Sequence, residues 1–361
     1  MKLFLRSALA FAVLGAPALA QKADEGPTYT SRDKADDDFA YAGEYLGWQK
    51  LQGSDRGSQR IGVQVVPLGN GKFTAVKYLG GLPGDGWLRG QRIILDGERT
   101  NDVVALKGDV TSLVVGPDHA EVVNDLGDKL GELQRVQRES PTMGAQPPAD
   151  ATVLFDGTGV DRFKNAKVND SGLLMAGTET KDAWNNFRLH GEFLLPYKPI
   201  ARGQSRGNSG FYLQGRYELQ VLDSFGLEGV ENECGGIYKL FRPAVNMCLP
   251  PLQWQTYDID FQAAKFDDAG NKVEPMTISV WQNGVPIHVQ RKVPSKTGAG
   301  TAEGPNPLPI KLQDHGNPVV YRNIWIIDTA NPAARDIDWL ALPLKAPPVP
   351  VAISHASGNQ F

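Results

Sequence analysis

The stretch Arg206-Gly-Asn-Ser-Gly-Phe-Tyr-Leu-Gln-Gly-Arg-Tyr-Glu-Leu-Gln-Val-Leu-Asp-Ser-Phe225 predicts two β-strands joined by a tight turn. Strand-forming residues dominate from Phe211, and Gln214-Gly215 supplies the turn. Successive strand side chains point in opposite directions, so the second strand has a polar face and an apolar face. The polar face carries Arg216, Glu218 and Gln220. Because such residues are costly against an apolar core, this face lines either water, as on an ordinary outer sheet face, or a cleft.

The composition is that of a globular all-β protein. The chain has 361 residues, 41% of them hydrophobic, which is enough for one large core or two modest ones. Its 40 Gly and 25 Pro are spread among strand-like runs, which favours a turn-rich β protein. The net charge of −4 and the lack of a basic cluster argue against nucleic acid or an anionic membrane surface as partner. We therefore expect a neutral ligand.

The first 20 residues have the pattern of a secretory signal peptide. Lys2 and Arg6 flank the start of an apolar run, and Ala18-Leu19-Ala20 is a small-residue cleavage site. The alternative, a membrane anchor, is disfavoured because Ser7–Ala20 is shorter than a bilayer span and contains Pro17. This pattern predicts an exported protein, periplasmic or extracellular.

Cys234 and Cys248 are the only cysteines and lie close together in the sequence. In an exported protein they are expected to form one disulfide that closes a short loop. The alternative is a pair of free buried thiols. A structural zinc site is disfavoured, since two cysteines without a nearby histidine cannot complete a tetrahedral shell.

A Pro-rich break divides the chain into two strand-rich regions, the first expected to be a small β-meander or barrel and the second a two-sheet sandwich. Hairpin signals such as Asn283-Gly284 support this division. The leader is polar and acidic and is expected to be mobile, and the tail is expected to fray or pack loosely. The predicted segments are a signal peptide (1–20), a flexible leader (21–38), a small all-β domain (39–138), a Pro-rich linker (139–151), a β-sandwich (152–328) and a Pro-rich tail (329–361).

Polar residues on three segments of the second domain can share one cleft. The segments carry Arg216, Glu218 and Gln220; Gln313 and His315; and Arg322 with Asn323. On the concave side of a curved sandwich a sugar can lie across the strands, where aromatic rings can stack on it, although such rings also serve as core. The candidate rings are Tyr212, Tyr238, Trp184 and Trp254.

Glu218 has the strongest case for chemistry, because a carboxylate near an amide and a histidine can act as a general base. His315 follows a strand and enters a turn, where site residues often lie. Its alternative role is that of a surface histidine bonded to Asp314.

An ordinary two-carboxylate glycosidase mechanism is disfavoured. The stretch Glu218–Asp223 is similar to the Glu-x-Asp-x-(x)-Glu strand of laminarinase-type retaining endoglucanases, but Gln220 replaces the central Asp. Glu218 and Asp223 are an odd number of residues apart and point to opposite faces of a regular strand. A retaining glycosidase needs its carboxylates about 5 Å apart, which only a bulge would restore here.

From about Thr152 to Asp328 the sequence resembles the 3-keto-disaccharide hydrolase domain, formerly a domain of unknown function. The motifs that carry the resemblance are Leu154-Phe155-Asp156-Gly157, Gly207-Asn208-Ser209-Gly210-Phe211-Tyr212, Tyr217-Glu218-Leu219-Gln220-Val221-Leu222-Asp223-Ser224, Cys234-Gly235-Gly236-Ile237-Tyr238, Trp254-Gln255-Thr256-Tyr257-Asp258, Gln282-Asn283-Gly284-Val285, Leu312-Gln313-Asp314-His315-Gly316-Asn317-Pro318 and Arg322-Asn323-Ile324-Trp325. The region before it resembles the small β domain that precedes this domain in some secreted bacterial members.

The resemblance implies a concanavalin-like jelly roll that acts on glycosides oxidised to a ketone at C3. The ketone acidifies the C2 proton, so that one base can remove it, the C1 substituent can leave and water can add. Members are described as lyases, hydratases or hydrolases, and the motifs do not distinguish these. The competing class is a carbohydrate-binding module without catalysis, since the same fold serves lectins.

We expect Glu218 and His315 to be the catalytic pair, with the roles of base and acid left open between them. The substrate-binding residues are expected to be Asn208, Arg216, Gln220, Tyr238, Gln313 and Arg322, all around one pocket. The one candidate cofactor is a divalent metal ion, which can serve as Lewis acid at the C3 oxygen. Asp223 is a candidate either as a ligand of this metal ion or as a residue that anchors a loop.

Overall fold

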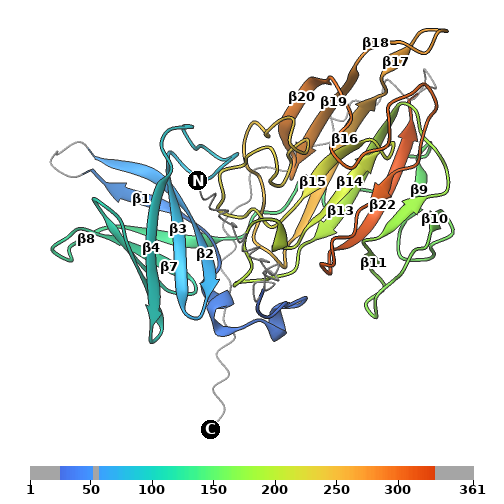
Figure 1. Cartoon of the computed structure of the whole chain (residues 1–361). Helices are drawn as coiled ribbons and strands as arrows, with labels where there is room; N and C mark the ends of the chain where they lie inside the picture. The colour runs from blue at the N-terminus through green and yellow to red at the C-terminus, as the bar shows by residue number, and fades with distance from the viewer. Residues whose placement is uncertain (1–24, 52–56, 330–361) are drawn as a thin grey trace, which may run out of the picture.

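The structure is a computed structural model that describes residues 25–51 and 57–329. A barrel, on the left in Figure 1, is followed by a two-sheet sandwich on the right. The described residues form strands and three short 3-10 helices, η1 (Arg32–Lys34), η2 (Asp37–Tyr41) and η3 (Gly203–Ser205), with no α-helix. The all-β prediction is therefore confirmed. The predicted signal peptide, and the predicted tail beyond residue 329, lie outside the described residues.

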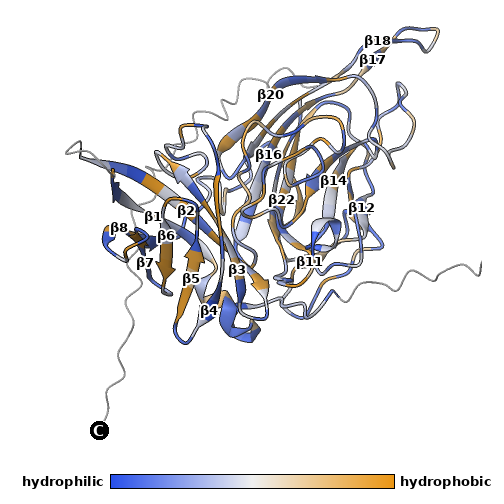
Figure 2. Cartoon of the chain, turned by 60° about the vertical axis from the view of Figure 1, so that its left-hand side comes forward, coloured by the Kyte–Doolittle hydropathy of each residue, from blue (hydrophilic) through white to orange (hydrophobic). Residues whose placement is uncertain are grey.

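The barrel is an eight-stranded antiparallel sheet closed by pairing of its first and last strands. Its strands are β1 (Gly43–Lys50), β2 (Ser58–Gly69), β3 (Lys72–Leu79), β4 (Ile93–Thr100), β5 (Val103–Lys107), β6 (Ser112–Val115), β7 (His119–Val123) and β8 (Lys129–Val136). Hydrophilic and hydrophobic residues occur within the same strands (Figure 2), as expected where alternate side chains face in and out. Buried side chains such as Tyr45, Ile61 and Phe73 fill the interior, so the barrel has a packed core.

The sandwich consists of a five-stranded and a seven-stranded sheet. The five-stranded sheet has the order β10 (Phe163–Lys164), β12 (Thr178–Thr180), β21 (Lys311–Leu312), β14 (Ser209–Leu213) and β15 (Tyr217–Val221). The seven-stranded sheet has the order β11 (Leu174–Met175), β22 (Val320–Asp328), β13 (Phe187–Leu194), β16 (Trp254–Gln262), β19 (Met276–Gln282) and β20 (Val285–Val293), with β9 (Thr152–Phe155) also paired to β22. A separate hairpin joins β17 (Lys265–Phe266) and β18 (Lys272–Glu274).

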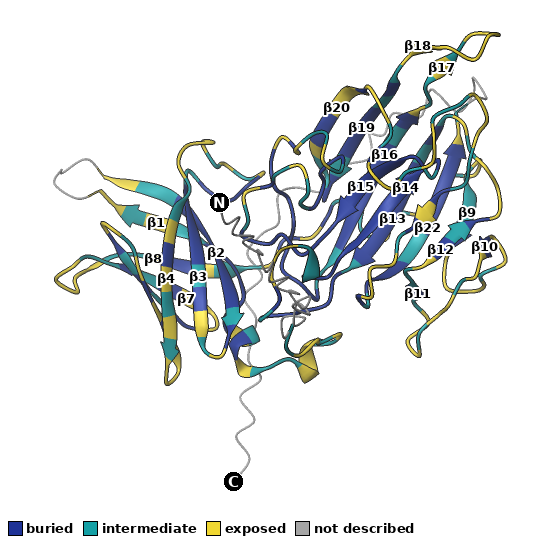
Figure 3. Cartoon of the chain, viewed as in Figure 1, coloured by how far each residue is buried: buried dark blue, intermediate teal, exposed yellow. Residues whose placement is uncertain are grey.

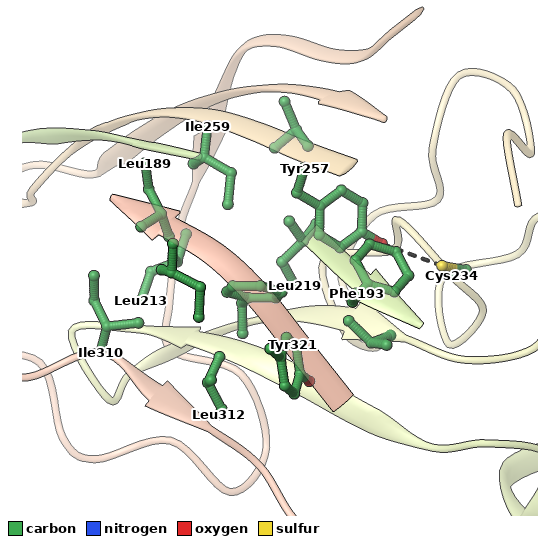
Figure 4. Close-up of a cluster of buried hydrophobic side chains, with 14 of the residues drawn as sticks. Leu189, Phe193, Leu213, Leu219, Cys234, Tyr257, Ile259, Ile310, Leu312 and Tyr321 are labelled. Carbon is green, nitrogen blue, oxygen red and sulfur yellow. Dashed lines mark hydrogen bonds between the residues drawn. The ribbon is translucent and has the colours of Figure 1, made fainter. Parts of the chain in front are cut away.

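The hairpin predicted from the opening stretch is β14–β15. Gln214 and Gly215 form its turn with φ angles of 52° and 57°, a backbone conformation that glycine adopts at no steric cost. The apolar residues of the hairpin face the second sheet and form the core with Tyr257 and Tyr321 (Figure 4). The central strands β13 to β16 are largely buried (Figure 3). Packing of their apolar side chains in the core therefore fixes the position of the polar side chains on the opposite face of β15.

The two domains share a packed interface. Val66 of β2 belongs to the sandwich core, and Arg92 donates a hydrogen bond to the carbonyl oxygen of Gly226 (2.6 Å). Where the chain leaves the barrel, Arg138 forms a buried ion pair with Glu44 (2.5 Å). The contacts of Val66 and Arg92 tie the barrel to the sandwich, and the Arg138 ion pair fixes the chain where it leaves the barrel.

Residues 25–38 differ from the expected mobile leader. Tyr29 exchanges two backbone hydrogen bonds with Tyr197 (both 2.9 Å), and their rings stack 5.6 Å apart. Asp38 is buried, where it accepts hydrogen bonds from Arg99 (2.9 Å) and from the backbone of Gly71 (2.8 Å). The polar composition suggested a solvated segment, but these side chains have long-range partners.

Candidate active site

A row of polar side chains crosses the outer face of the five-stranded sheet. Strand pairing places one residue of each strand side by side, in the order Glu218, Tyr212, Lys311, Glu179 and Lys164. The next residue along each strand points to the core, as Leu219 and Leu312 do. The alternation predicted from the sequence therefore brings titratable groups from five strands onto one surface.

Glu218 lies at the end of this row and is only 3% exposed. Tyr212 donates a hydrogen bond from its hydroxyl to Glu218 Oε2 (2.7 Å). Burial raises the pKa of Glu218 to about 7, although the hydrogen bond from Tyr212 and the charge of Lys311 act in the opposite direction. Glu218 can thus gain or lose a proton near neutral pH, as a general base requires.

Gln220 lies next to Glu218 on the same face. In one orientation of its amide, the nitrogen points to Gln204 Oε1 (3.0 Å) and Asn208 Oδ1 (3.3 Å). In the other, the nitrogen donates to Glu218 Oε1 (3.1 Å) and to the carbonyl oxygen of Ser209 (3.1 Å). We adopt the second orientation, because in the first the amide oxygen faces only acceptors. Gln220 then holds the second carboxylate oxygen of Glu218.

Gly210 leaves open the space in front of Glu218. A Cβ atom at this position would lie 2.8 Å from Glu218 Oε1 and 3.1 Å from Gln313 Oε1. Within the described part of the chain, Gln313 Oε1 is buried and accepts no hydrogen bond. Two acceptor oxygens thus flank one small space, which suits a hydrogen-bond donor such as a substrate hydroxyl or water.

Two hollows lie on this face. The first, about 380 Å³, is the Lys311 hollow, lined by Lys164, Glu179, Tyr212, Gly215, Ala299, Thr301, Leu308, Pro309, Lys311 and Gln313. The second, about 280 Å³, is the His315 hollow, lined by Glu25, Gln204, Ser205, Asn208, Tyr238, His315, Gly316 and Asn317. Asn208 and Tyr212 flank Gly210 along the same face of the chain, so the space in front of Glu218 lies between the two hollows.

The predicted site residues divide between these hollows instead of converging on one pocket. Asn208, Tyr238 and His315 line the His315 hollow, and Gln313 lines the Lys311 hollow. Glu218 contacts residues of the Lys311 hollow through Tyr212. The two expected catalytic residues therefore belong to adjacent regions of one polar surface.

Arg216 has a different place from the predicted pocket wall. Its guanidinium donates to the carbonyl oxygens of Ala302 and Asn306 (both 3.0 Å) and to Gln214 Oε1 (2.9 Å). It thereby holds the loop that supplies Thr301 and its neighbours to the Lys311 hollow. The residue positions the wall without forming it.

Arg322 lies on the other sheet. It forms an ion pair with Glu192 (2.7 Å) and stacks on the ring of Trp254 at 4.0 Å, both on the seven-stranded sheet. Strand alternation identifies the face of a strand but not the sheet to which that face belongs. The prediction that Arg322 lines the same pocket as Glu218 is therefore wrong, and Trp254 is engaged as its stacking partner.

Asp223 has the contacts of a loop anchor. Its Oδ2 accepts two hydrogen bonds from Arg206 (2.6 and 3.1 Å), and its Oδ1 accepts one from the backbone of Phe225 (3.2 Å). A carboxylate neutralised by arginine is a poor donor for a divalent cation. Among the described residues no group of three or more His, Cys, Asp or Glu side chains is arranged to hold a metal ion. The residues present do not fit the suggested metal.

Cys234 and Cys248 are both free and buried in the structure, which differs from the predicted disulfide. Cys234 Sγ lies 3.2 Å from the hydroxyl of Tyr257, in the sandwich core (Figure 4). Cys248 Sγ lies 3.5 Å from the carbonyl oxygen of Leu222. The two thiols occupy the alternative role, that of small buried side chains.

Sequence reasoning missed two features of the site. Lys311 is not among the predicted site residues, although it is two residues before Gln313 and alternation places both side chains on one face of the chain. Tyr212 was considered only for ring stacking, whereas its hydroxyl is the hydrogen-bond donor to Glu218. Its position opposite Glu218 follows from the short turn of the predicted hairpin, which was the available signal.

The polar row and its buried carboxyl define a sandwich domain with a candidate catalytic face. The model of the 3-keto-alpha-glucoside-1,2-lyase-like domain family matches residues 150–327. This domain of the chain belongs to that family, which supports a carbohydrate-active hydrolase as its general class.

About half of the chain is also similar in sequence to two solved structures. One crystal structure of a "putative glycosyl hydrolase" from Parabacteroides distasonis ATCC 8503 is 34% identical, with 50% of this chain and 84% of that chain covered and a TM-score of 0.47. Another of the same description and organism is 20% identical, with coverage of 50% and 94% and a TM-score of 0.37. No curated protein sequence matches the chain.

Proposed function

We propose that the protein cleaves the glycosidic bond of 3-keto-glycosides by elimination at C1–C2 followed by hydration. The observation that carries this proposal is the buried carboxyl of Glu218 in the polar row, whose pKa is raised to about 7 and which lies next to Gly210. A carboxylate with a raised pKa is a stronger base than an exposed one and is still deprotonated near neutral pH. Removal of an acidified C–H proton needs such a base and no second carboxylate.

In the first step the Glu218 carboxylate takes the C2 proton, and the electron pair of the C2–H bond forms the enolate with the C3 ketone. The enolate then expels the C1 substituent, whose oxygen leaves with the bonding pair and takes a proton. Water adds at C1 and a proton returns to C2, so the net reaction is hydrolysis without oxidation or reduction. Protonated Glu218 is placed to return the proton.

Charge that develops on the C3 oxygen needs a nearby donor. Lys311 acts electrostatically on Glu218 and its Nζ lies 5.9 Å from the centre of the Tyr212 ring. The ammonium group therefore borders the place where the enolate forms, and we assign it this stabilising role. The 3-keto sugar accordingly occupies the Lys311 hollow.

His315 is exposed and lines the adjacent hollow. We assign it to the leaving-group side, where it protonates the departing oxygen or holds the water that adds later. The location of the two residues supports this assignment, because Glu218 is buried beside Tyr212 of the Lys311 hollow, whereas His315 is exposed in the other hollow.

The test uses purified protein, a 3-keto-glucoside and the matching unoxidised glucoside in deuterated water. We expect release of the leaving group from the 3-keto compound alone, with deuterium at C2 of the sugar product. Equal turnover of both glucosides, or a product without deuterium at C2, would contradict the elimination mechanism. A carbohydrate-binding module would bind the sugars and release nothing.

We also propose that the protein is exported, on the strength of the signal-like residues 1–20. Within residues 25–51 and 57–329 the structure contains no helix with the length and hydrophobicity needed to span a membrane. Fractionation of cells that express the full chain, with N-terminal sequencing of the product, tests the export and the cleavage after Ala20.

A further inference from the structure

We propose that Glu25, a residue outside the family domain, completes the His315 hollow and sets its specificity for a polyhydroxylated leaving group, that is, a second sugar. This inference rests on the proposed function, because the leaving group is the C1 substituent that the proposed elimination expels. Glu25 lies 125 residues before the start of the matched region at residue 150, yet its side chain lines the hollow beside Asn208 and His315.

The carboxylate of Glu25 is held in a defined position. Its Oε2 accepts from Lys198 Nζ (2.7 Å) and its Oε1 accepts from Ser205 Oγ (3.1 Å). Lys198 is buried, and its Nζ also donates to Asn317 Oδ1 (2.9 Å). Ser205 and Asn317 line the same hollow. Glu25 therefore holds one of these wall residues directly and the other through Lys198.

The backbone around Glu25 is built onto the sandwich. Gly26 packs so closely against Ile200 that a Cβ atom would lie 2.7 Å from Ile200 Cδ1, and its φ of +66° favours glycine. Three residues further on, Tyr29 pairs with Tyr197 through two backbone hydrogen bonds. In Figure 1 the blue N-terminal segment lies between barrel and sandwich at the bottom of the view, consistent with these contacts. The position of Glu25 is therefore part of the fold.

The lining of the hollow indicates what it binds. Its side chains present a carboxylate, two hydroxyls, three amides and an imidazole, and the second hydroxyl is on the phenol ring of Tyr238. Such groups bind hydroxyls at several points, whereas a flat apolar leaving group would leave them unpaired. Asn208 joins the hollow to the catalytic face, since its amide nitrogen donates to the carbonyl oxygen of Gln204 (3.0 Å) and its side chain lies beside the Gln220 amide that holds Glu218. The hollow is thus placed next to the bond that Glu218 breaks.

The experiment compares two 3-keto-glucosides, one with glucose and one with methanol as the leaving group. For Glu25→Gln we expect kcat/KM to fall about tenfold on the 3-keto-disaccharide, the scale of one charge-assisted hydrogen bond, and less than twofold on the methyl glycoside. Glu228→Gln is the matched control, because Glu228 also pairs with a cation (Arg242, 2.9 Å) but lines neither hollow. It should change neither rate.

A second variant, Gly26→Val, moves the leader while keeping the Glu25 carboxylate. The clash with Ile200 should displace Glu25 and give the same selective loss on the disaccharide. An equal loss on both substrates, or no loss on either, with Glu25→Gln would overturn the proposal.

A binding measurement separates this inference from the proposed function. In titration calorimetry with an unoxidised glucosyl-glucose disaccharide, the Glu218→Gln protein should bind about tenfold more tightly than the Glu25→Gln, Glu218→Gln double variant. If neither 3-keto substrate is cleaved but this difference is found, the proposed reaction fails and the subsite stands. Equal affinities of the two variants would remove the subsite whatever the chemistry.

Discussion

The two outer faces of the sandwich carry similar residues, but the pKa of the buried glutamate on one face is raised and that on the other is lowered. On the five-stranded sheet, Glu218 is buried beside Tyr212, whose side chain lines the Lys311 hollow. On the seven-stranded sheet, Glu192 is fully buried and contacts Arg322 (2.7 Å) and His190 (3.6 Å). Burial alone would raise the pKa of either carboxyl, so the difference between them must come from their partners.

On the outer face of the seven-stranded sheet, called the closed face, the charged side chains neutralise one another. Burial would raise the pKa of Glu192, but hydrogen bonds from His190, Asn323, Arg322 and the backbone of Gly144 lower it to about 2. In the same way, burial would lower the pKa of His190, but Asp258 at 2.6 Å and Glu192 raise it to about 9. This cluster is an internal salt bridge, and it holds its protons across the neutral range.

The predicted linker covers this closed face. Thr142 donates to Asp258 (2.7 Å), Ser140 shares a hydrogen bond with Thr256 (2.6 Å), and the backbone of Gly144 donates to Glu192 (2.7 Å). On the outer face of the five-stranded sheet, called the open face, Glu218 has hydrogen bonds but no ion pair among the described residues, and its partner Tyr212 lines the Lys311 hollow. Carboxylates with ion-pair partners therefore stabilise the fold, while Glu218, which has no ion pair among the described residues, keeps a pKa suited to proton transfer.

The largest expected effect is that of Glu218→Gln, which separates activity from stability. The rate on a 3-keto-glucoside should fall at least about a hundredfold, the usual scale for removing an acid or base. A rise in pKa from 4.5 to about 7 means that the buried charge costs on the order of 3 kcal/mol above pH 7. The variant should therefore be more stable than the parent at pH 8 and no more stable below pH 4.5. Undiminished activity would remove Glu218 from the site.

Glu192→Gln should destabilise the protein, whereas Glu218→Gln should stabilise it. The lowered pKa of Glu192, from 4.5 to about 2, means that its charge stabilises the fold by on the order of 3 kcal/mol above pH 4.5. That stability is lost as pH falls through 2. Urea unfolding at pH 7 should show the loss, and the gap should narrow at pH 3. Glu179→Gln is the control, since its pair with Lys164 is exposed and contributes little. A gap that is equal at both pH values would contradict the assigned charge.

The open face was largely predictable from the sequence because it depends on local periodicity. A tight turn after Leu213 fixes the register of β14 and β15, and alternation then places Glu218, Gln220 and Tyr212 on one surface. The same rule failed for Arg322, because periodicity carries no information about which sheet a strand joins. It also failed for Arg216, which is on the expected face but reaches beyond the strand to a loop some 86 residues away in sequence.

The closed face was not predicted, because its partners come from distant segments. His190 and Asp258 are 68 residues apart and meet only through pairing of β13 with β16. The polar residues of 139–151 looked like a solvated linker, and those of 25–38 like a mobile leader, since composition does not reveal long-range partners for polar side chains. The burial of the Glu218 carboxyl, and hence its raised pKa, required the structure for the same reason.

A smaller loss of activity is expected from Gly210→Ala. The added Cβ would lie 2.8 Å from Glu218 Oε1, so the flexible carboxylate must move while the backbone, without a positive φ here, accepts alanine. Misplacing a catalytic group by about an ångström costs up to a hundredfold, and we expect about tenfold. Gly90→Ala is the control, because nothing lies within 4 Å of its Cβ position. Full activity of Gly210→Ala would show that the space in front of Glu218 is not where the substrate reacts.

The smallest expected effect is a shift in the pH profile with Tyr212→Phe. In the parent protein kcat/KM should rise with pH to a plateau, with a midpoint near 7, because Glu218 must be deprotonated to act as base. The Tyr212 hydroxyl donates to the charged carboxylate and so lowers the pKa of Glu218; phenylalanine removes that hydrogen bond while keeping the ring. The midpoint should move to higher pH, and the plateau should stay close to that of the parent. A lowered plateau with an unmoved midpoint would instead make Tyr212 a proton donor in the reaction. That result would also mean that burial and the hydrogen bond from Gln220 set the pKa of Glu218 without a contribution from Tyr212.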